Sequence, residues 1–95
     1  MDLRLRRTEI PTGTPLVDDW RVTLAGHTIG RIMRVQRAGA EWVWFWSFYI
    51  SPNSTADRGD AATLEAAAAA FRARAEAAAP FDPHRMIYLP RENER

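Results

Sequence analysis

Two stretches in the first half of the chain alternate apolar and polar residues, and a third is rich in aromatic residues; all three patterns predict β-strands. The stretches cover residues 18–24, 28–36 and 41–50. Short connections around Gly26 and Gly39 separate them and are typical of hairpin turns. We therefore expect an antiparallel meander.

The third stretch reads EWVWFWSFYI and is apolar on both faces. Side chains of a strand point alternately to opposite faces. One face therefore carries Trp42, Trp44 and Trp46, and the other carries Val43, Phe45 and Tyr49.

The turns indicate which of these faces is the core. If the tight turn in Ala25-Gly26-His27 is a two-residue hairpin, Trp20, Val22 and Leu24 lie on the face of Ile29, Met33 and Val35. A three-residue loop at 37–39 would continue that face through Val43, Phe45 and Tyr49. We expect a helix to cover this face, with the tryptophans left on the opposite face beside Arg21 and Arg34.

The second half of the chain predicts one loop and one helix. Turn-forming residues fill 51–62, and Thr63 is a good N-cap for a helix that Pro80 stops. Small alanines let this helix lie close to a sheet. We predict an α+β fold: an antiparallel meander of three or four strands followed by one helix packed on one sheet face.

The length of 95 residues indicates a single domain, residues 1–95, with its core at about 16–79. Residues 1–15 form an N-terminal strand or arm in this interpretation, and 80–95 form a C-terminal tail. The apolar cluster at 86–89 could cover the second face of the sheet, pair with a sheet edge, or dock on another subunit.

Composition narrows the function classes. The formal net charge of +1 gives no global attraction to nucleic acid or an anionic membrane, although arginines are concentrated in the first 40 residues. There is no cysteine, and no apolar run has the length of a signal peptide core or a membrane span. We expect a cytoplasmic protein with no membrane association.

The sequence shows no grouping of residues that is typical of a metal site or of acid–base catalysis. His27 and His84 have no second ligand at metal spacing, and the aspartates are scattered over loops. We therefore expect no metal site, no cofactor and no enzymatic activity.

The tryptophan face is the strongest functional signal. Three exposed tryptophans would form an apolar patch of at least about 450 Å², so something should cover them. The cover could be another part of the chain, a protein partner or second copy, or stacked nucleic-acid bases. The residues expected to bind are Trp42, Trp44, Trp46, Arg34 and Arg21.

The leading hypothesis is a non-enzymatic protein-interaction module, with a homodimer formed through the tryptophan face and the tail as one form of it. The alternative is a small nucleic-acid-binding protein that uses the same aromatic residues and arginines.

The order of motifs resembles a set of small uncharacterised proteins from alphaproteobacteria of the rhizobial kind. The shared pattern is a Gly-Arg-Ile strand, a Trp-x-Trp strand and a Thr-x-Glu-Ala-Ala helix that continues to Ala-Phe. The matching positions are Gly30, Arg31, Ile32, Trp44, Trp46, Thr63, Glu65, Ala66, Ala67, Ala70 and Phe71. The resemblance covers about residues 18 to 75 and implies no activity.

Overall fold

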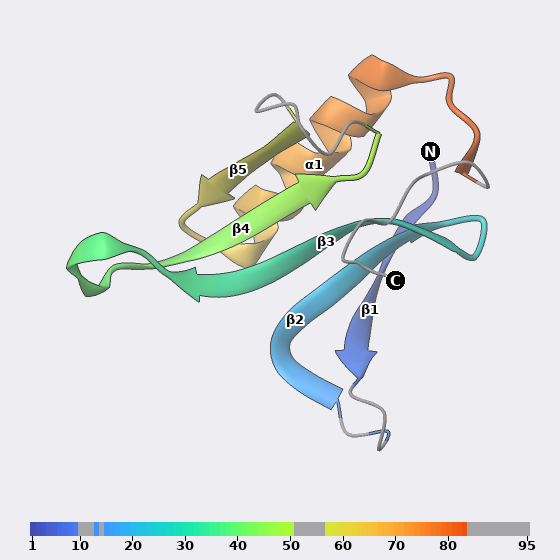
Figure 1. Ribbon diagram of the computed structural model, residues 1–95. Helices are drawn as coiled ribbons and strands as arrows, with labels where there is room; N and C mark the ends of the chain where they lie inside the picture. The colour runs from blue at the N-terminus through green and yellow to red at the C-terminus, as the bar shows by residue number, and fades with distance from the viewer. Residues whose placement is uncertain (10–12, 14, 51–56, 84–95) are drawn as a thin grey trace, which may run out of the picture.

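The computed structural model of the chain describes residues 1–9, 13, 15–50 and 57–83. Five strands precede one helix in the chain (Figure 1). They are β1 (Leu3–Glu9), β2 (Pro15–Leu24), β3 (His27–Gln36), β4 (Trp42–Phe48) and β5 (Arg58–Ala61), followed by α1 (Leu64–Ala78). A short 3-10 turn, η1 (Ala38–Ala40), joins β3 to β4.

The strands form one antiparallel sheet in the order β1-β2-β3-β4-β5, so each strand pairs with the next one in the chain. This confirms the predicted meander and the α+β class, with five strands in the sheet. The N-terminal segment supplies β1 as an edge strand.

Strand β5 lies within the segment that we expected to be a loop. Its sequence, Arg-Gly-Asp-Ala, has no apolar alternation, and its backbone pairs with that of β4. A Cβ atom on Gly59 would lie 3.0 Å from Trp46 Nε1. A glycine at this position therefore lets the indole pack against the backbone of the neighbouring strand. Residues 51–56 lie outside the described part of the chain.

The helix begins and ends close to where the sequence predicts. Thr63 is the N-cap, and its hydroxyl oxygen accepts a hydrogen bond of 3.0 Å from the backbone N–H of Ala66. Glu65 lies in the first turn, where its charge favours the positive end of the helix dipole. The helix stops at Ala78, two residues before Pro80.

The core lies on the tryptophan face, so the predicted core face was wrong. Helix α1 packs over β4 and β5 and reaches β3 (Figure 1). Phe71 of α1 makes edge-to-face contacts with Trp46 and Phe48, at centroid distances of 6.3 and 5.5 Å. The buried core cluster is Val22, Ile29, Ile32, Trp46, Phe48, Ala67, Phe71 and Ala75.

A β-bulge in the first hairpin explains the error. The turn at Ala25 and Gly26 has the two residues expected, both with positive φ. Thr23 then pairs with Thr28, but Val22 pairs with Gly30, which leaves one extra residue in β3. One extra residue exchanges the faces beyond it. Trp20 and Val22 consequently lie on the face of Ile32 and the tryptophans.

In the second hairpin, the residues of β3 and β4 share faces as predicted, although the loop is longer than expected. Arg37 N–H donates to the carbonyl of Glu41 at 2.7 Å, and Gly39 has the expected positive φ of 81°. Gln36 pairs with Trp42, so five residues connect the strands instead of three. An insertion of two residues preserves the faces. Val43 and Phe45 lie on the face away from α1.

Candidate functional site

The structure separates the five residues that the sequence grouped as a binding surface. Trp46 is only 8% exposed and belongs to the core. Trp44 is half-buried and packs against the same cluster. Trp42 is 52% exposed. Arg21 pairs with Arg31 and lies on the opposite face of the sheet from these tryptophans.

Trp42 and Arg34 form the part of that group that stays together on the surface. The Arg34 guanidinium lies over the Trp42 ring, 5.2 Å from its centroid, in cation–π geometry. Its other contact is an ion pair of 3.8 Å with Asp18. The indole is thus supported from one side, while half of its surface stays open to solvent.

A recess, which we call the helix-side groove, lies on the same sheet face as Trp42. It encloses about 210 Å³ between β1, β2, β3 and α1. The residues that line it are Leu3, Arg4, Leu5, Val22, Ile32, Ala68, Phe71 and Arg72. The groove exists because α1 covers β4 and β5 but not the β1 side of the sheet (Figure 1).

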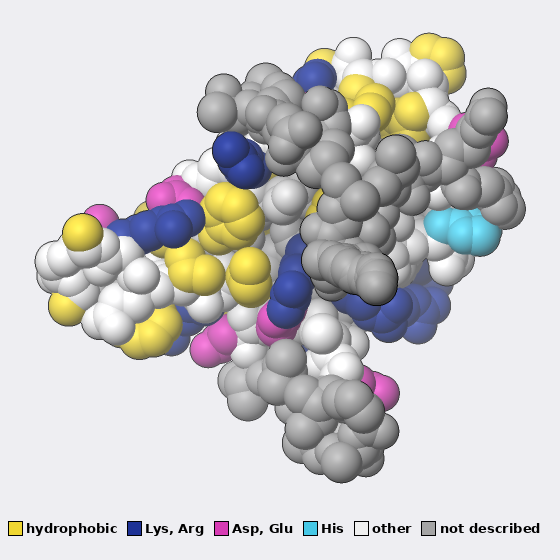
Figure 2. Space-filling model, viewed as in Figure 1, with side chains coloured by type: hydrophobic (Ala, Val, Ile, Leu, Met, Phe, Trp, Pro, Cys, Tyr) yellow, Lys and Arg dark blue, Asp and Glu magenta, His cyan; other side chains and the backbone are white. Residues whose placement is uncertain are grey.

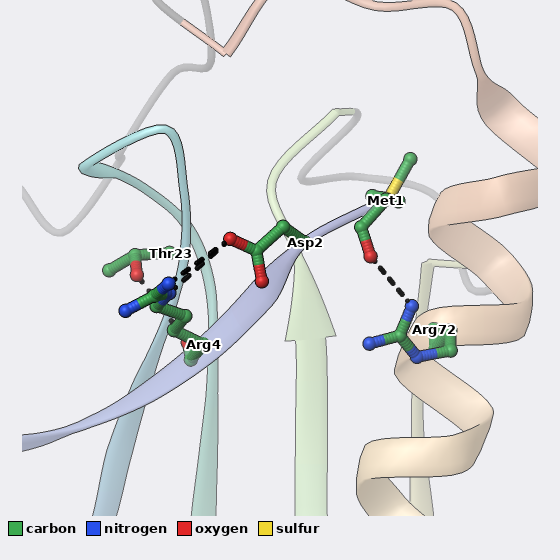
Figure 3. A network of polar contacts seen from close by, with 5 residues as sticks. All are labelled: Met1, Asp2, Arg4, Thr23 and Arg72. Atoms are coloured by element: carbon green, nitrogen blue, oxygen red, sulfur yellow. Dashed lines mark hydrogen bonds and ion pairs between the residues drawn. The ribbon is translucent and has the colours of Figure 1, made fainter.

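Polar contacts of the N-terminus join β1 to α1 beside this groove (Figure 3). Arg72 donates from Nη1 to the carbonyl of Met1 at 2.9 Å. Arg4 forms an exposed ion pair of 3.3 Å with Asp2, and the Thr23 hydroxyl donates to the Arg4 carbonyl at 3.5 Å. The start of β1 is therefore held by the helix as well as by β2.

The sheet face away from α1 carries a row of arginines. Arg6 pairs with Arg21, and Arg21 pairs with Arg31, so these side chains are cross-strand neighbours on three adjacent strands. The row continues through Ser47 of β4 to Arg58 of β5. Figure 2 views the sheet from this side and shows arginine side chains among hydrophobic and acidic ones.

A pocket of about 240 Å³ opens beside this row and is lined by Thr8, Arg21, Thr28, Arg31 and Tyr49. Next to it lies Asp19, which is only 8% exposed. Its carboxylate accepts hydrogen bonds of 2.8 Å from the Thr8 hydroxyl and from Arg31 Nε, and a second contact from Arg31 Nη2. The two-point contact with Asp19 fixes the Arg31 guanidinium plane.

Arg21 is held more loosely. Its Nη1 donates to the Thr28 hydroxyl at 3.3 Å, and the described residues supply it with no carboxylate. The side chain is exposed. Arg21 therefore brings to the pocket a positive charge that no described carboxylate neutralises.

A second ion pair stabilises the far end of this face. Arg37 donates to both carboxylate oxygens of Asp60, at 2.8 and 3.1 Å, and its guanidinium lies 5.3 Å from the Phe45 centroid. The hydrogen bonds that Arg37 donates to Asp60 raise the pKa of Arg37 above its ordinary value. Phe45, which we expected beneath the helix, is instead half-buried under this guanidinium.

Sequence reasoning missed the pocket residues Thr8, Thr28, Arg31 and Tyr49 as a group. Arg31 and Tyr49 were expected within strands. The predicted turn lengths, however, placed Arg21 on the same sheet face as Arg34 and not on that of Arg31. The signal that could have found the group is the Ile29-Gly30 step, because a glycine within a strand is common at a bulge.

Within the described ranges, the structure shows no cluster of three or more metal-ligating His, Asp or Glu side chains. Among the described residues no helix is long and apolar enough to span a membrane.

Comparisons with protein-family models, with curated proteins and with solved structures found no match to this chain.

Proposed function

We propose that the protein is a non-enzymatic interaction module that associates with a second copy of itself through the helix side of the sheet. The observation that carries this proposal is Trp42, which is 52% exposed on the face that also contains the apolar groove. Tryptophan is the residue type most enriched among the residues that dominate binding at protein interfaces.

A projecting side chain and a recess on one face favour a symmetric dimer. In a two-fold interface the same patch meets itself, so each Trp42 can enter the groove of the other copy. The groove floor is apolar, from Leu5, Val22 and Ile32, and Leu5 is itself 38% exposed. Burial of Trp42 and Leu5 in the interface would remove two large exposed apolar side chains from water.

The supporting geometry is already ordered in the single chain. Arg34 holds the Trp42 ring from one side, which lowers the entropy lost when the indole is immobilised at an interface. Phe71 and Ala68, which form the helix wall of the groove, lie on a capped helix. Such preorganised surfaces bind with less ordering cost than flexible ones.

The test is the mass in solution by size-exclusion chromatography with light scattering. We expect twice the chain mass of 10.8 kDa for the unaltered protein. Trp42→Ala should raise the dissociation constant of the dimer by about 30-fold or more, since loss of a central tryptophan costs about 2 kcal/mol or more.

Ile50→Ala is the matched control, because Ile50 is a large apolar residue of the same exposure as Leu5, 38%, but lies in the turn after β4. This variant should keep the dimer. A monomer for the unaltered protein at high concentration, or equal weakening by both variants, would contradict self-association through this face.

The nucleic-acid alternative has less support from the geometry. It requires aromatic residues and arginines on one surface, yet Arg21 lies on the opposite face from Trp44 and Arg34. An oligonucleotide strand could not contact all of these residues on one face.

A further inference from the structure

The arginine row places like charges side by side on neighbouring strands. Directly paired side chains on such strands lie about 5 Å apart at Cβ, and like charges at that distance destabilise a sheet. Arg6, Arg21 and Arg31 form such a series, in which Arg31 contacts the Asp19 carboxylate and the described residues supply Arg21 with no carboxylate. Arg21 is therefore the member of the row that can attract an anion.

The pocket beside the row is lined by residues with polar side chains, among them Arg21, Arg31 and Thr28. Arg31 is held by Asp19, so Arg21 and Thr28 are the groups that we expect to contact a ligand. Thr28 accepts its hydrogen bond from Arg21, which leaves its own hydroxyl hydrogen to donate to a ligand. Guanidinium groups match the oxygens of phosphate in a two-point geometry.

The pocket size favours a small ligand over a polymer. Its volume of about 240 Å³ is slightly below the usual range for sites of small organic molecules, about 300 to 1,000 Å³. The wall formed by the Tyr49 ring offers apolar contact beside the charged groups. A phosphate group attached to a short organic moiety could contact the charged groups with its phosphate and the apolar wall with its organic part.

We propose that the pocket formed by Thr8, Arg21, Thr28, Arg31 and Tyr49 binds a small phosphorylated ligand. Asp19 is a positioning residue, because its contacts with Thr8 and Arg31 fix two walls of the site. This site lies on the sheet face opposite the dimer surface and does not depend on self-association.

The primary experiment compares thermal unfolding in sodium phosphate with unfolding in sodium chloride at the same ionic strength. A ligand that binds only the folded state raises the unfolding midpoint in proportion to its occupancy. The unaltered protein should show a saturable rise with inorganic phosphate. Acetate, a planar anion, should give a smaller rise.

Arg21→Gln should weaken phosphate binding by about tenfold or more, as expected for the loss of a charged donor. In chloride alone the same variant should be at least as stable as the unaltered protein, because it removes a like-charge contact. Loss of an arginine with only a structural role would not weaken phosphate binding while leaving stability in chloride unchanged or higher.

Arg58→Gln is the matched control, since Arg58 is an exposed arginine of the same row but does not line the pocket. It should keep the full phosphate-dependent rise. Shifts of backbone amide resonances on phosphate addition should be concentrated at Thr28, Arg31 and Tyr49, which locates binding independently of stability.

Two outcomes would overturn the proposal. One is the same phosphate-dependent rise in the unaltered protein and in Arg21→Gln, which would reflect a general salt effect. The other is the absence of a saturable phosphate response together with binding of a short single-stranded oligonucleotide that Arg21→Gln and Arg58→Gln weaken equally. That result would make the arginine row a nucleic-acid surface.

Discussion

At the scale of single residues, Gly30 determines how closely the helix approaches the sheet. A Cβ atom at this position would lie 2.2 Å from Phe71 Cε2 and 2.4 Å from the carbonyl oxygen of Ser47. Both distances are far below van der Waals contact, and one of the atoms belongs to the backbone of β4. The close packing of Phe71 on β3 therefore requires a glycine.

We predict that Gly30→Ala destabilises the protein by about 3 kcal/mol, at the upper end of the range for overpacking a core. The clash with a backbone atom cannot be relieved by a change of rotamer. Denaturant unfolding measures the loss.

Gly26→Ala is the comparison, because a Cβ atom there meets nothing within 4 Å and only the φ of +82° is unfavourable. Its cost should be about 1 kcal/mol. The prediction fails if Gly30→Ala is no more destabilising than Gly26→Ala.

At the scale of elements, one ion pair with a buried carboxylate connects the segment before β5 to the helix. Asp57 is only 2% exposed, and its carboxylate accepts a hydrogen bond of 2.6 Å from Arg74 Nε of α1. Arg74 is 32% exposed, so water can solvate its charge in part when Asp57 is removed, and the loss of a hydrogen bond to a charged group costs about 1.5 to 3 kcal/mol. Asp57→Ala should lose stability in that range, as measured by denaturant unfolding.

The exposed pair Arg37–Asp60 provides the contrast for this prediction. Its side chains are 45% and 41% exposed, so water screens their attraction. Asp60→Ala should cost less than about 1 kcal/mol. Similar losses for Asp57→Ala and Asp60→Ala would show that burial does not control the strength of these pairs.

The elements that local patterns define were predictable from the sequence. Alternation located β2 and β3, the run of aromatic residues located β4, and the Thr63 cap and Pro80 bounded the helix. The bulge near Ile29 was not predictable, because it depends on how β2 and β3 pair and not on local propensity. Strand β5 was missed for a similar reason. Its sequence has no alternating apolar residues, so only the pairing of its backbone with β4 defines it as a strand.

The candidate site was harder to predict than the fold, because it depends on the face of every strand. Trp42 and Arg34 were correctly placed together, since the second hairpin has the predicted parity. Arg21 was misplaced, since the bulge lies between its pair with Arg31 and the turn that joins β2 to β3. One undetected residue in a strand thus moved an arginine from one proposed surface to the other.

At the scale of the whole molecule, the sheet separates two surfaces of different chemistry. The helix side combines apolar residues with Trp42, whereas the opposite side combines arginines with hydroxyl groups. Side chains of the two surfaces point away from each other across the sheet, because each pair of opposite residues shares one face. Among the described residues, no side chain lines both the helix-side groove and the pocket.

We therefore predict that the two binding events are energetically independent. Effects of substitutions that have no shared partners usually add within about 0.5 kcal/mol. Trp42→Ala should abolish the dimer and leave the phosphate-dependent rise in unfolding midpoint unchanged. Arg21→Gln should keep the dimer and weaken the phosphate-dependent rise. The double variant should lose dimerisation and phosphate binding each to the same extent as the corresponding single variant. Light scattering with and without phosphate measures the coupling directly, and a dimer dissociation constant that changes with phosphate would show that the sheet transmits binding from one face to the other.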